Sequence, residues 1–423
     1  MRFLLLLSIF IVVLVAPVNA QDEDTVSLPG RIAYVGLDHN VYVLTPQTNA
    51  VAQLSDDATD DLRYQWPTWS TDGRLAYFQS SFVNDFVSFM RGVYVSPDAQ
   101  SESELVYRSG NDVFQYAYWS PSNCDASGTC RDLAVLLSSP EQGMFLELIR
   151  DGVTMEQNQT LLGGPPFYYS WSPDGQRMLW HRVEDERVRL EIYDVTDNTV
   201  LETLPQQPGF INAPGWSPVD DRLLIGVRNT DNAGVTDLVI SGHNEVTTLA
   251  TELDGLVSFA WSPDGNRVAY RVADNNAYGP LVVVDATTTE TVTISPSEEV
   301  IAFFWSPDSQ RIAYVTFANN PGAFNISNTQ QQRDARLVWS VLDVSTGTTY
   351  TYGAFVPTGD MVYMLRFFDQ FAQSHRIWSP DSRHIIYSEL APGGPVISLV
   401  DGTEIDSVPF SIAEGLIGIW SFD

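Results

Sequence analysis

The residues that could carry acid–base or metal chemistry in this chain are few and dispersed. The sequence contains neither the H-E-x-x-H of a zinc protease nor the G-x-S-x-G of a serine hydrolase. A pair of carboxylates for glycoside cleavage could lie among the 53 acidic residues without a linear signature. No two of the five histidines have the spacing of metal ligands, so we expect neither a metal nor a cofactor; they are His39, His181, His243, His375 and His384.

One segment gathers most of the side chains that could recognise a ligand. Residues 361–371 are dense in aromatic side chains and lead into Ser374, His375 and Arg376. The segment would either bind a ligand or partner, or form a flap whose aromatic rings pack as an accessory core. Packing is the commoner fate of such clusters. The binding hypothesis assigns the site to Arg366, Phe367, Phe368, Asp369, Gln370, His375 and Arg376.

The elements that must position these residues are repeats marked by Trp-Ser. Eight short stretches end in this pair, and successive tryptophans are separated by 50, 52, 45, 45, 44, 73 and 42 residues. A signature that recurs at such a period indicates a repeat architecture. The eight tryptophans are Trp69, Trp119, Trp171, Trp216, Trp261, Trp305, Trp378 and Trp420.

Each repeat reads as four β-strands. In the clearest copy, an apolar run ends at Trp261, the turn Ser262-Pro263-Asp264-Gly265 follows, and a second strand begins at Arg267. Proline, aspartate and glycine at these places favour a tight hairpin with the glycine in the left-handed conformation. Two more strand-like segments complete the repeat, with almost no helical periodicity outside the N-terminal segment and 363–373. Four strands in ~45 residues are typical of one blade of a β-propeller. We expect the tryptophans to pack between blades.

The two ends of the chain complement each other. Residues 31–35, 41–45 and 51–54 supply three strands without a Trp-Ser strand, and 416–421 supply one such strand alone. Pairing them would close the ring and remove its exposed sheet edges. We therefore predict an all-β, closed propeller over residues 31–423, with eight blades. Seven is the alternative if the copy around Trp216 or Trp378 is misinterpreted.

Function is expected on one face of the disc. The Ser-Pro-Asp-Gly turns would lie on the first face, and the longer, varied connections on the second, where binding usually concentrates. The seventh repeat carries two insertions on that second face, 318–336 and 354–374, and the candidate residues belong to or follow the latter. The other long connections are 80–91, 228–236 and 272–279.

The Trp-Ser-Pro-Asp-Gly hairpin, followed by a strand such as Arg267-Val268-Ala269-Tyr270, resembles the repeat of the TolB-type propellers. The resemblance covers residues 30–423 and implies a WD-repeat-like β-propeller. Segment 21–30 offers no counterpart of the α/β domain that precedes the propeller of TolB, a partner of the Tol–Pal envelope system. The prolyl-oligopeptidase-like enzymes carry related repeats, but the sequence lacks their hydrolase motif.

The first twenty residues are predicted to be a secretory signal. Arg2 supplies the positive charge, residues 3–15 the apolar core, and Val18-Asn19-Ala20 a small-residue cleavage site. The core is shorter than a membrane span, so we expect no membrane insertion after cleavage. In an exported chain, Cys124 and Cys130 are expected to form a disulfide; a two-thiolate metal site is the alternative.

Composition excludes several classes of function. The chain contains no lysine, so a lysine Schiff base is ruled out, and its formal net charge of −31 argues against nucleic acid or an anionic membrane as a partner. We interpret the chain as an exported, extracytoplasmic, monomeric and non-catalytic scaffold that binds a protein, peptide or glycan. The alternatives are a polysaccharide lyase or glycoside hydrolase acting at the mouth of the channel, and a structural subunit of a cell-envelope complex.

Overall fold

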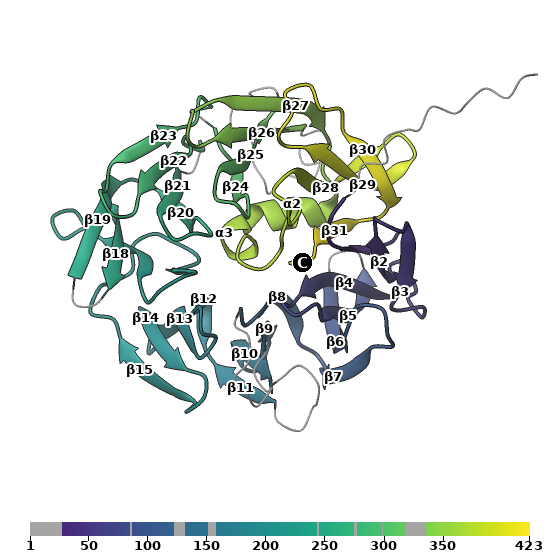
Figure 1. Cartoon of the computed structure of the whole chain (residues 1–423). Coiled ribbons are helices and arrows are strands. Elements are labelled where there is room, and N and C mark those ends of the chain that lie inside the picture. The colour runs from purple at the N-terminus through teal and green to yellow at the C-terminus, as the bar shows by residue number, and fades with distance from the viewer. Residues whose placement is uncertain are drawn as a thin grey trace, which may run out of the picture.

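The computed structural model describes residues 28–84, 87–121, 132–150, 158–242, 245–274, 277–297, 299–318 and 336–423. These residues form eight antiparallel sheets arranged in a ring around a central axis (Figure 1). The predicted eight-bladed β-propeller is therefore confirmed. The signal segment, Cys124, Cys130 and most of the insertion 318–336 lie outside the described residues, so those predictions stay untested.

The blades are numbered in chain order, and each is given from its innermost strand outward. Blade 1 contains β31 (Ile417–Trp420), β1 (Ile32–Val35), β2 (Val41–Thr45) and β3 (Ala50–Gln53). Blade 2 contains β4 (Leu62–Trp69), β5 (Leu75–Asn84), β6 (Val87–Ser96) and β7 (Glu104–Arg108). Blade 3 contains β8 (Val113–Trp119), β9 (Leu133–Ser139), β10 (Gly143–Ile149) and β11 (Gln159–Leu162). Blade 4 contains β12 (Gly164–Trp171), β13 (Arg177–Glu184), β14 (Arg187–Asp194) and β15 (Thr199–Thr203).

The second half of the chain repeats this arrangement. Blade 5 contains β16 (Gly215–Trp216), β17 (Leu223–Arg228), β18 (Thr236–Gly242) and β19 (Glu245–Leu253). Blade 6 contains β20 (Leu256–Trp261), β21 (Arg267–Ala273), β22 (Val282–Asp285) and β23 (Thr291–Ile294). Blade 7 contains β24 (Ala302–Trp305), β25 (Arg311–Phe317), β26 (Leu337–Asp343) and β27 (Thr349–Phe355). Blade 8 contains β28 (His384–Ala391), β29 (Gly394–Asp401) and β30 (Phe410–Glu414), and an isolated bridge between Trp378 and Ile385 takes the place of its inner strand.

The ring closes where the two ends of the chain meet. Strand β31 pairs antiparallel with β1, from Ile32 opposite Trp420 to Val35 opposite Ile417. The side chains of β31 are all buried. The predicted closure is confirmed, and it supplies the partner that β1 would otherwise lack at its inner edge.

The Ser-Pro-Asp-Gly turns are held by their own side chains. In blade 6, Ser262 Oγ donates to Asp264 Oδ1 at 2.6 Å and accepts from the backbone amide of Arg267 at 2.9 Å. Gly265 has φ +70°, as a hairpin of this kind requires. Ser309 and Ser382 adopt the same left-handed conformation in blades 7 and 8, with φ +61° and +62°.

The repeated tryptophans join neighbouring blades, as predicted. Trp119 of blade 3 donates its Nε1 hydrogen to the carbonyl oxygen of Thr68 in blade 2 at 2.9 Å. Trp378 makes the same bond to Phe304 in the previous blade at 3.0 Å. Four blades also contact the next blade through an arginine whose guanidinium carbon lies 4.8–5.0 Å from the centroid of the tryptophan ring in that next blade. These pairs are Arg31–Trp69, Arg74–Trp119, Arg177–Trp216 and Arg222–Trp261.

Two short helices lie at the centre of the ring: α2 (Gly359–Arg366) and α3 (Phe368–Phe371) (Figure 1). Both helices belong to the second insertion of the seventh repeat. This insertion contains residues 363–373, one of the two segments in which the sequence shows helical periodicity. Among the described residues, no helix is long and apolar enough to cross a membrane.

Candidate functional site

The insertion between blades 7 and 8 forms a plug, which we define as residues 357–376. Thr358 caps α2 by accepting a hydrogen bond from the amide of Met361, and Asp360 and Arg366 carry the charges that favour the first and last turns of a helix. Met361, Met364 and Leu365 lie at i, i+3 and i+4 and are buried. Local sequence thus favours the helix, and its apolar face directs it into the ring.

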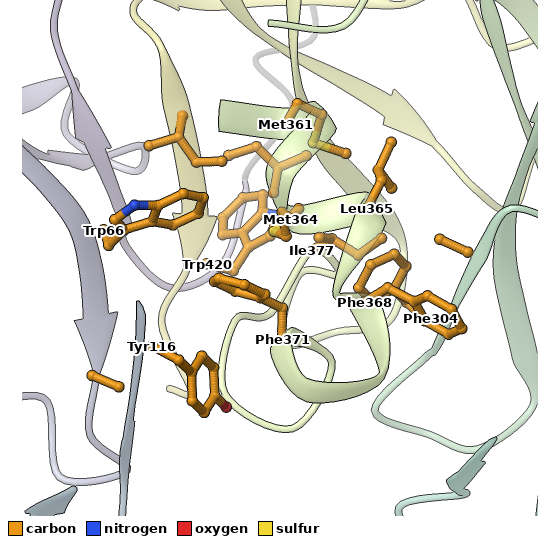
Figure 2. Packing of buried hydrophobic residues seen from close by; sticks show 14 of the residues in the cluster. Trp66, Tyr116, Phe304, Met361, Met364, Leu365, Phe368, Phe371, Ile377 and Trp420 are labelled. Carbon is orange, nitrogen blue, oxygen red and sulfur yellow. The ribbon is translucent and has the colours of Figure 1, made fainter. Parts of the chain in front are cut away.

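Aromatic packing fixes the plug against opposite sides of the ring (Figure 2). Phe368 packs against Phe303 and Phe304 of β24, with ring centroids 4.9 and 6.2 Å apart. Phe371 packs on the other side, 5.0 Å from Trp66 and 5.2 Å from Tyr116. Phe368 and Phe371 are both 1% exposed. These two rings therefore pack as an accessory core, the alternative to a binding site that the sequence left open.

A buried polar network completes the docking of the plug. The Tyr116 hydroxyl lies 2.9 Å from the carbonyl oxygen of Gln370 and 2.7 Å from Ser374 Oγ. Ser374 Oγ lies 2.7 Å from His375 Nδ1, and Thr68 Oγ1 lies 3.4 Å from His375 Nε2. Burial lowers the pKa of His375 to about 3, so this imidazole is neutral at physiological pH. The network holds the plug in place around an uncharged imidazole.

The structure distributes the seven predicted site residues over three places. Arg366 and Phe367 line a pocket at one end of the plug, and His375 and Arg376 line a different cavity at the other end. The three residues between them, Phe368, Asp369 and Gln370, are at most 3% exposed and line neither space.

The cavity at the His375 end lies on the face of the Ser-Pro-Asp-Gly turns. It measures about 350 Å³, and five prolines that follow Trp-Ser pairs contribute to its walls: Pro121, Pro173, Pro218, Pro263 and Pro307. Arg376 stacks on Phe422 from the C-terminal segment, with 4.1 Å between the guanidinium carbon and the ring centroid. Asp369 does not line this cavity, so the cluster of His375, Arg376 and Asp369 that would favour a channel-mouth enzyme is not formed.

The larger pocket, about 590 Å³, opens on the loop-rich face. We call it the loop-face pocket. The blade-to-blade connections from blade 4 to blade 8 surround it, with the second-to-third-strand connections of blades 5 to 7 and one side of α2. Its lining includes Arg271, Tyr278, Phe317, Val362, Arg366 and Phe367. Its volume is in the range of ordinary ligand sites.

Arg271 of β21 is the most unusual residue of this pocket. Its side chain is buried, with 4% of the residue exposed, and its Nε and Nη1 atoms have no hydrogen-bond partner among the described residues. The guanidinium carbon lies 5.0 Å from the Tyr278 ring centroid and 5.1 Å from that of Phe368. Burial lowers the pKa of Arg271 to about 10, which leaves it positively charged at neutral pH.

The charges around Arg271 differ in their exposure. Asp369 is buried, and no ion pair within 4.0 Å joins it to Arg271; burial raises the pKa of Asp369, while the Arg271 charge lowers it. Asp254 and Asp274 line the pocket as exposed residues. Arg366 is also exposed. Burial raises the pKa of the Tyr278 phenol, and the charges of Arg271 and Arg366 oppose part of this rise.

Sequence reasoning missed Arg271 and Tyr278 as site residues. Tyr278 falls in the connection 272–279, which was predicted to lie on the working face, but Arg271 reads as an ordinary residue of a second strand. The signal that could have pointed to it is its place immediately before that connection, at the end of the strand that meets the loop-rich face.

No protein-family model matches the chain, and no curated protein matches it. Solved structures show the fold. The dihydro-heme d1 dehydrogenase NirN, in complex with DHE, aligns at 14% identity over 95% of this chain and 77% of that chain, with a TM-score of 0.55. A eukaryotic initiation factor aligns at 12% identity over 92% of this chain and 98% of that chain, with a TM-score of 0.53.

The TolB structure from Acinetobacter baumannii is also among the similar structures. It aligns at 14% identity over 85% of this chain and 83% of that chain, with a TM-score of 0.40. The ring of eight blades is consistent with the TolB-type, WD-like repeat predicted from the sequence. Similarity at these identities concerns the fold, because propellers host unrelated functions.

Proposed function

We propose that this chain is an exported, non-catalytic β-propeller that binds a peptide, or an extended segment of a protein, in its loop-face pocket. The observation that carries the proposal is the plug itself. It fills the centre of the ring with buried aromatic side chains and leaves a pocket beside α2 on the face with the longest connections.

The walls of the loop-face pocket favour such a ligand. Phe317, Phe367 and Tyr278 give it aromatic surface, and Val362 and Leu365 of α2 add aliphatic surface. Four of its six polar or charged lining side chains carry charge: Asp254, Arg271, Asp274 and Arg366. Apolar walls with a few placed charged groups suit the apolar side chains and the charged groups of a peptide.

Export rests on the N-terminal segment. Its positive end, short apolar core and small residues before Gln21 are those of a cleaved signal. N-terminal sequencing of the secreted protein tests this part of the proposal, and the expected first residue is Gln21.

A peptide-display selection tests binding. The bait is the purified protein without the predicted signal, and selected peptides are then measured against the variant Val362→Trp. Val362 lies on α2 and lines the pocket, so an indole there should occupy the ligand volume and abolish binding. The matched control is Val51→Trp, at a residue 53% exposed on β3 at the outer edge of blade 1.

Two results would contradict the proposal. If no peptide is enriched, or if every enriched peptide binds Val362→Trp as well as it binds the parent protein, the loop-face pocket is not a peptide site. Hydrolysis or elimination of a bound polysaccharide would instead support the enzyme alternative.

A further inference from the structure

We infer that the loop-face pocket recognises a carboxylate group of its ligand through Arg271 and Arg366. This inference rests on the proposed function and adds the chemical class of the ligand. A carboxylate at the C-terminus of a peptide and one on an acidic side chain present the same chemistry, and the experiment below separates the two.

Arg271 is a buried cation, 4% exposed, whose Nε and Nη1 atoms lack a partner among the described residues. Buried arginines ordinarily bond to a carboxylate or to carbonyl oxygens, because removing the charge from water is unfavourable without such partners. An arginine that lines a pocket without them is arranged to receive an acceptor from outside.

Two aromatic rings orient the guanidinium of Arg271. The guanidinium carbon lies over the rings of Tyr278 and Phe368, 5.0 and 5.1 Å from their centroids. These rings hold the side chain in place without using its N–H groups, since cation–π contacts engage the charge and not the hydrogen-bond donors. The Nε and Nη1 donors thus stay unbonded at the wall of the pocket. A planar anion such as a carboxylate, the group that matches an arginine fork best, would satisfy them.

A second arginine and two exposed aspartates also line the pocket. Arg366 lines the same pocket from the last turn of α2, and its guanidinium lies over its neighbour Phe367, 5.4 Å from the ring centroid. Asp254 and Asp274 are exposed, and Asp274 Oδ1 accepts from the amide of Ala277 in its own loop. Asp369 forms no ion pair with Arg271 within 4.0 Å. Arg271 is therefore the buried charge in the wall of the pocket, and Asp254 and Asp274 lie at exposed positions around it.

The aromatic walls define the remainder of the ligand. Tyr278, Phe317 and Phe367 surround the pocket. They would contact an apolar or aromatic side chain next to the carboxylate. A peptide with such a residue beside a free C-terminus, or beside aspartate or glutamate, satisfies both requirements.

Three matched dipeptides test this inference by calorimetric titration of the protein without its predicted signal. Acetyl-Gln-Phe with a free C-terminus carries a terminal carboxylate, acetyl-Glu-Phe-amide carries only a side-chain carboxylate, and acetyl-Gln-Phe-amide carries neither. We expect at least one acid to bind about tenfold or more tightly than the neutral dipeptide, as one charge-assisted bond to a buried arginine implies. The acid that binds more tightly identifies the source of the carboxylate.

Two variants connect the preference to the arginines. Arg271→Gln should lower the affinity for the acidic dipeptide to that for the neutral dipeptide. Arg366→Gln should reduce the ratio of these two affinities about threefold, because its charge is more exposed. Arg187→Gln, at an exposed residue of β14, is the control and should leave the preference unchanged. If Arg271→Gln does not fold, Arg366→Gln still tests the inference, because Arg366 is exposed.

The outcomes separate this inference from the proposed function. Carboxylate recognition is wrong if the three dipeptides bind with equal affinity, or if none of them binds. It is also wrong if the acidic dipeptides still bind more tightly than the neutral one to both Arg271→Gln and Arg366→Gln. The display selection could also yield neutral peptides that bind the parent protein and not Val362→Trp. This result would support the peptide pocket and contradict its recognition of a carboxylate. Selection of no peptide would contradict the proposed function itself.

Discussion

The side chain of Gln370 pairs with the backbone of Tyr169 as if it were part of a neighbouring strand. Its Nε2 atom donates to the Tyr169 carbonyl oxygen at 3.0 Å, and its Oε1 atom accepts from the Tyr169 amide at 3.4 Å. Tyr169 lies on β12, the innermost strand of blade 4, whose channel side has no other strand beside it. A single glutamine of the plug thus satisfies both backbone groups of a residue on the opposite side of the ring.

Removing this pair should destabilise the plug. Replacement of Gln370 by alanine leaves two buried backbone groups of Tyr169 without partners, so we expect the free energy of unfolding to fall by ~1–3 kcal/mol. Urea unfolding followed by tryptophan fluorescence measures the change. The control Gln142→Ala, at an exposed turn residue, should alter stability by less than about 0.5 kcal/mol. Equal effects of the two changes would show that the Gln370 pair contributes nothing.

The arginine that follows each turn should contribute to cohesion between blades. Arg222 lies 4.9 Å from the centroid of the Trp261 ring and donates from Nη2 to the carbonyl oxygen of Gly265 at 2.7 Å. Arg222→Ala removes both contacts, and we expect a loss of about 1–2 kcal/mol of stability. Thermal unfolding measures it beside Arg187→Ala, where a surface arginine is removed. A midpoint no lower than that of the control would contradict the prediction.

Acid should loosen the plug through His375. Its pKa lies near 3 in the folded protein because burial disfavours the cation, against an ordinary value near 6.5. Since the folded pKa is the lower one, the unfolded chain binds more protons between these values. Stability from neutral His375 is therefore complete above about pH 6.5 and is lost as the pH falls toward about 3.

Proton titration by NMR checks the behaviour of His375 directly. The Cε1–H resonance of His375 should stay at its neutral position at pH 5, where an exposed imidazole is charged. Burial also lowers the pKa of His181 and His384, so the assignment needs the variant His375→Gln for comparison. A resonance that titrates near pH 6.5 would show that the imidazole is solvated and the prediction wrong.

Ring closure should be essential to folding. Deletion of residues 416–423 removes β31, which pairs with β1 and is entirely buried. We expect the shortened protein to aggregate or unfold near room temperature, because the inner edge of β1 and several apolar side chains become exposed. Deletion of residues 422–423 leaves β31 in place and is the control. Size-exclusion chromatography distinguishes the outcomes, and a monomeric, folded truncation would contradict the prediction.

Much of the fold could be predicted from the sequence because it is encoded locally and repeated eight times. Trp261 and the turn from Ser262 to Gly265 specify an inner strand and a hairpin within a dozen residues. The complementary ends of the chain then determined closure, since an orphan strand at 416–421 had only one trio of strands to complete. Eight copies of one pattern average out the uncertainty of any single copy.

The candidate site depended on contacts that no local pattern encodes. The sequence identified the aromatic insertion, and it left open whether that segment binds a ligand or packs as a core. Only the tertiary structure shows that Phe368 and Gln370 are buried in the ring while Arg366 lines a pocket. The burial of Arg271 likewise depends on a distant segment. Its guanidinium lies against Phe368 of the plug, almost a hundred residues later in the chain, and two of its nitrogens lack a partner among the described residues. Backbone geometry is a property of neighbouring residues, whereas burial and the presence of a partner are set by distant ones.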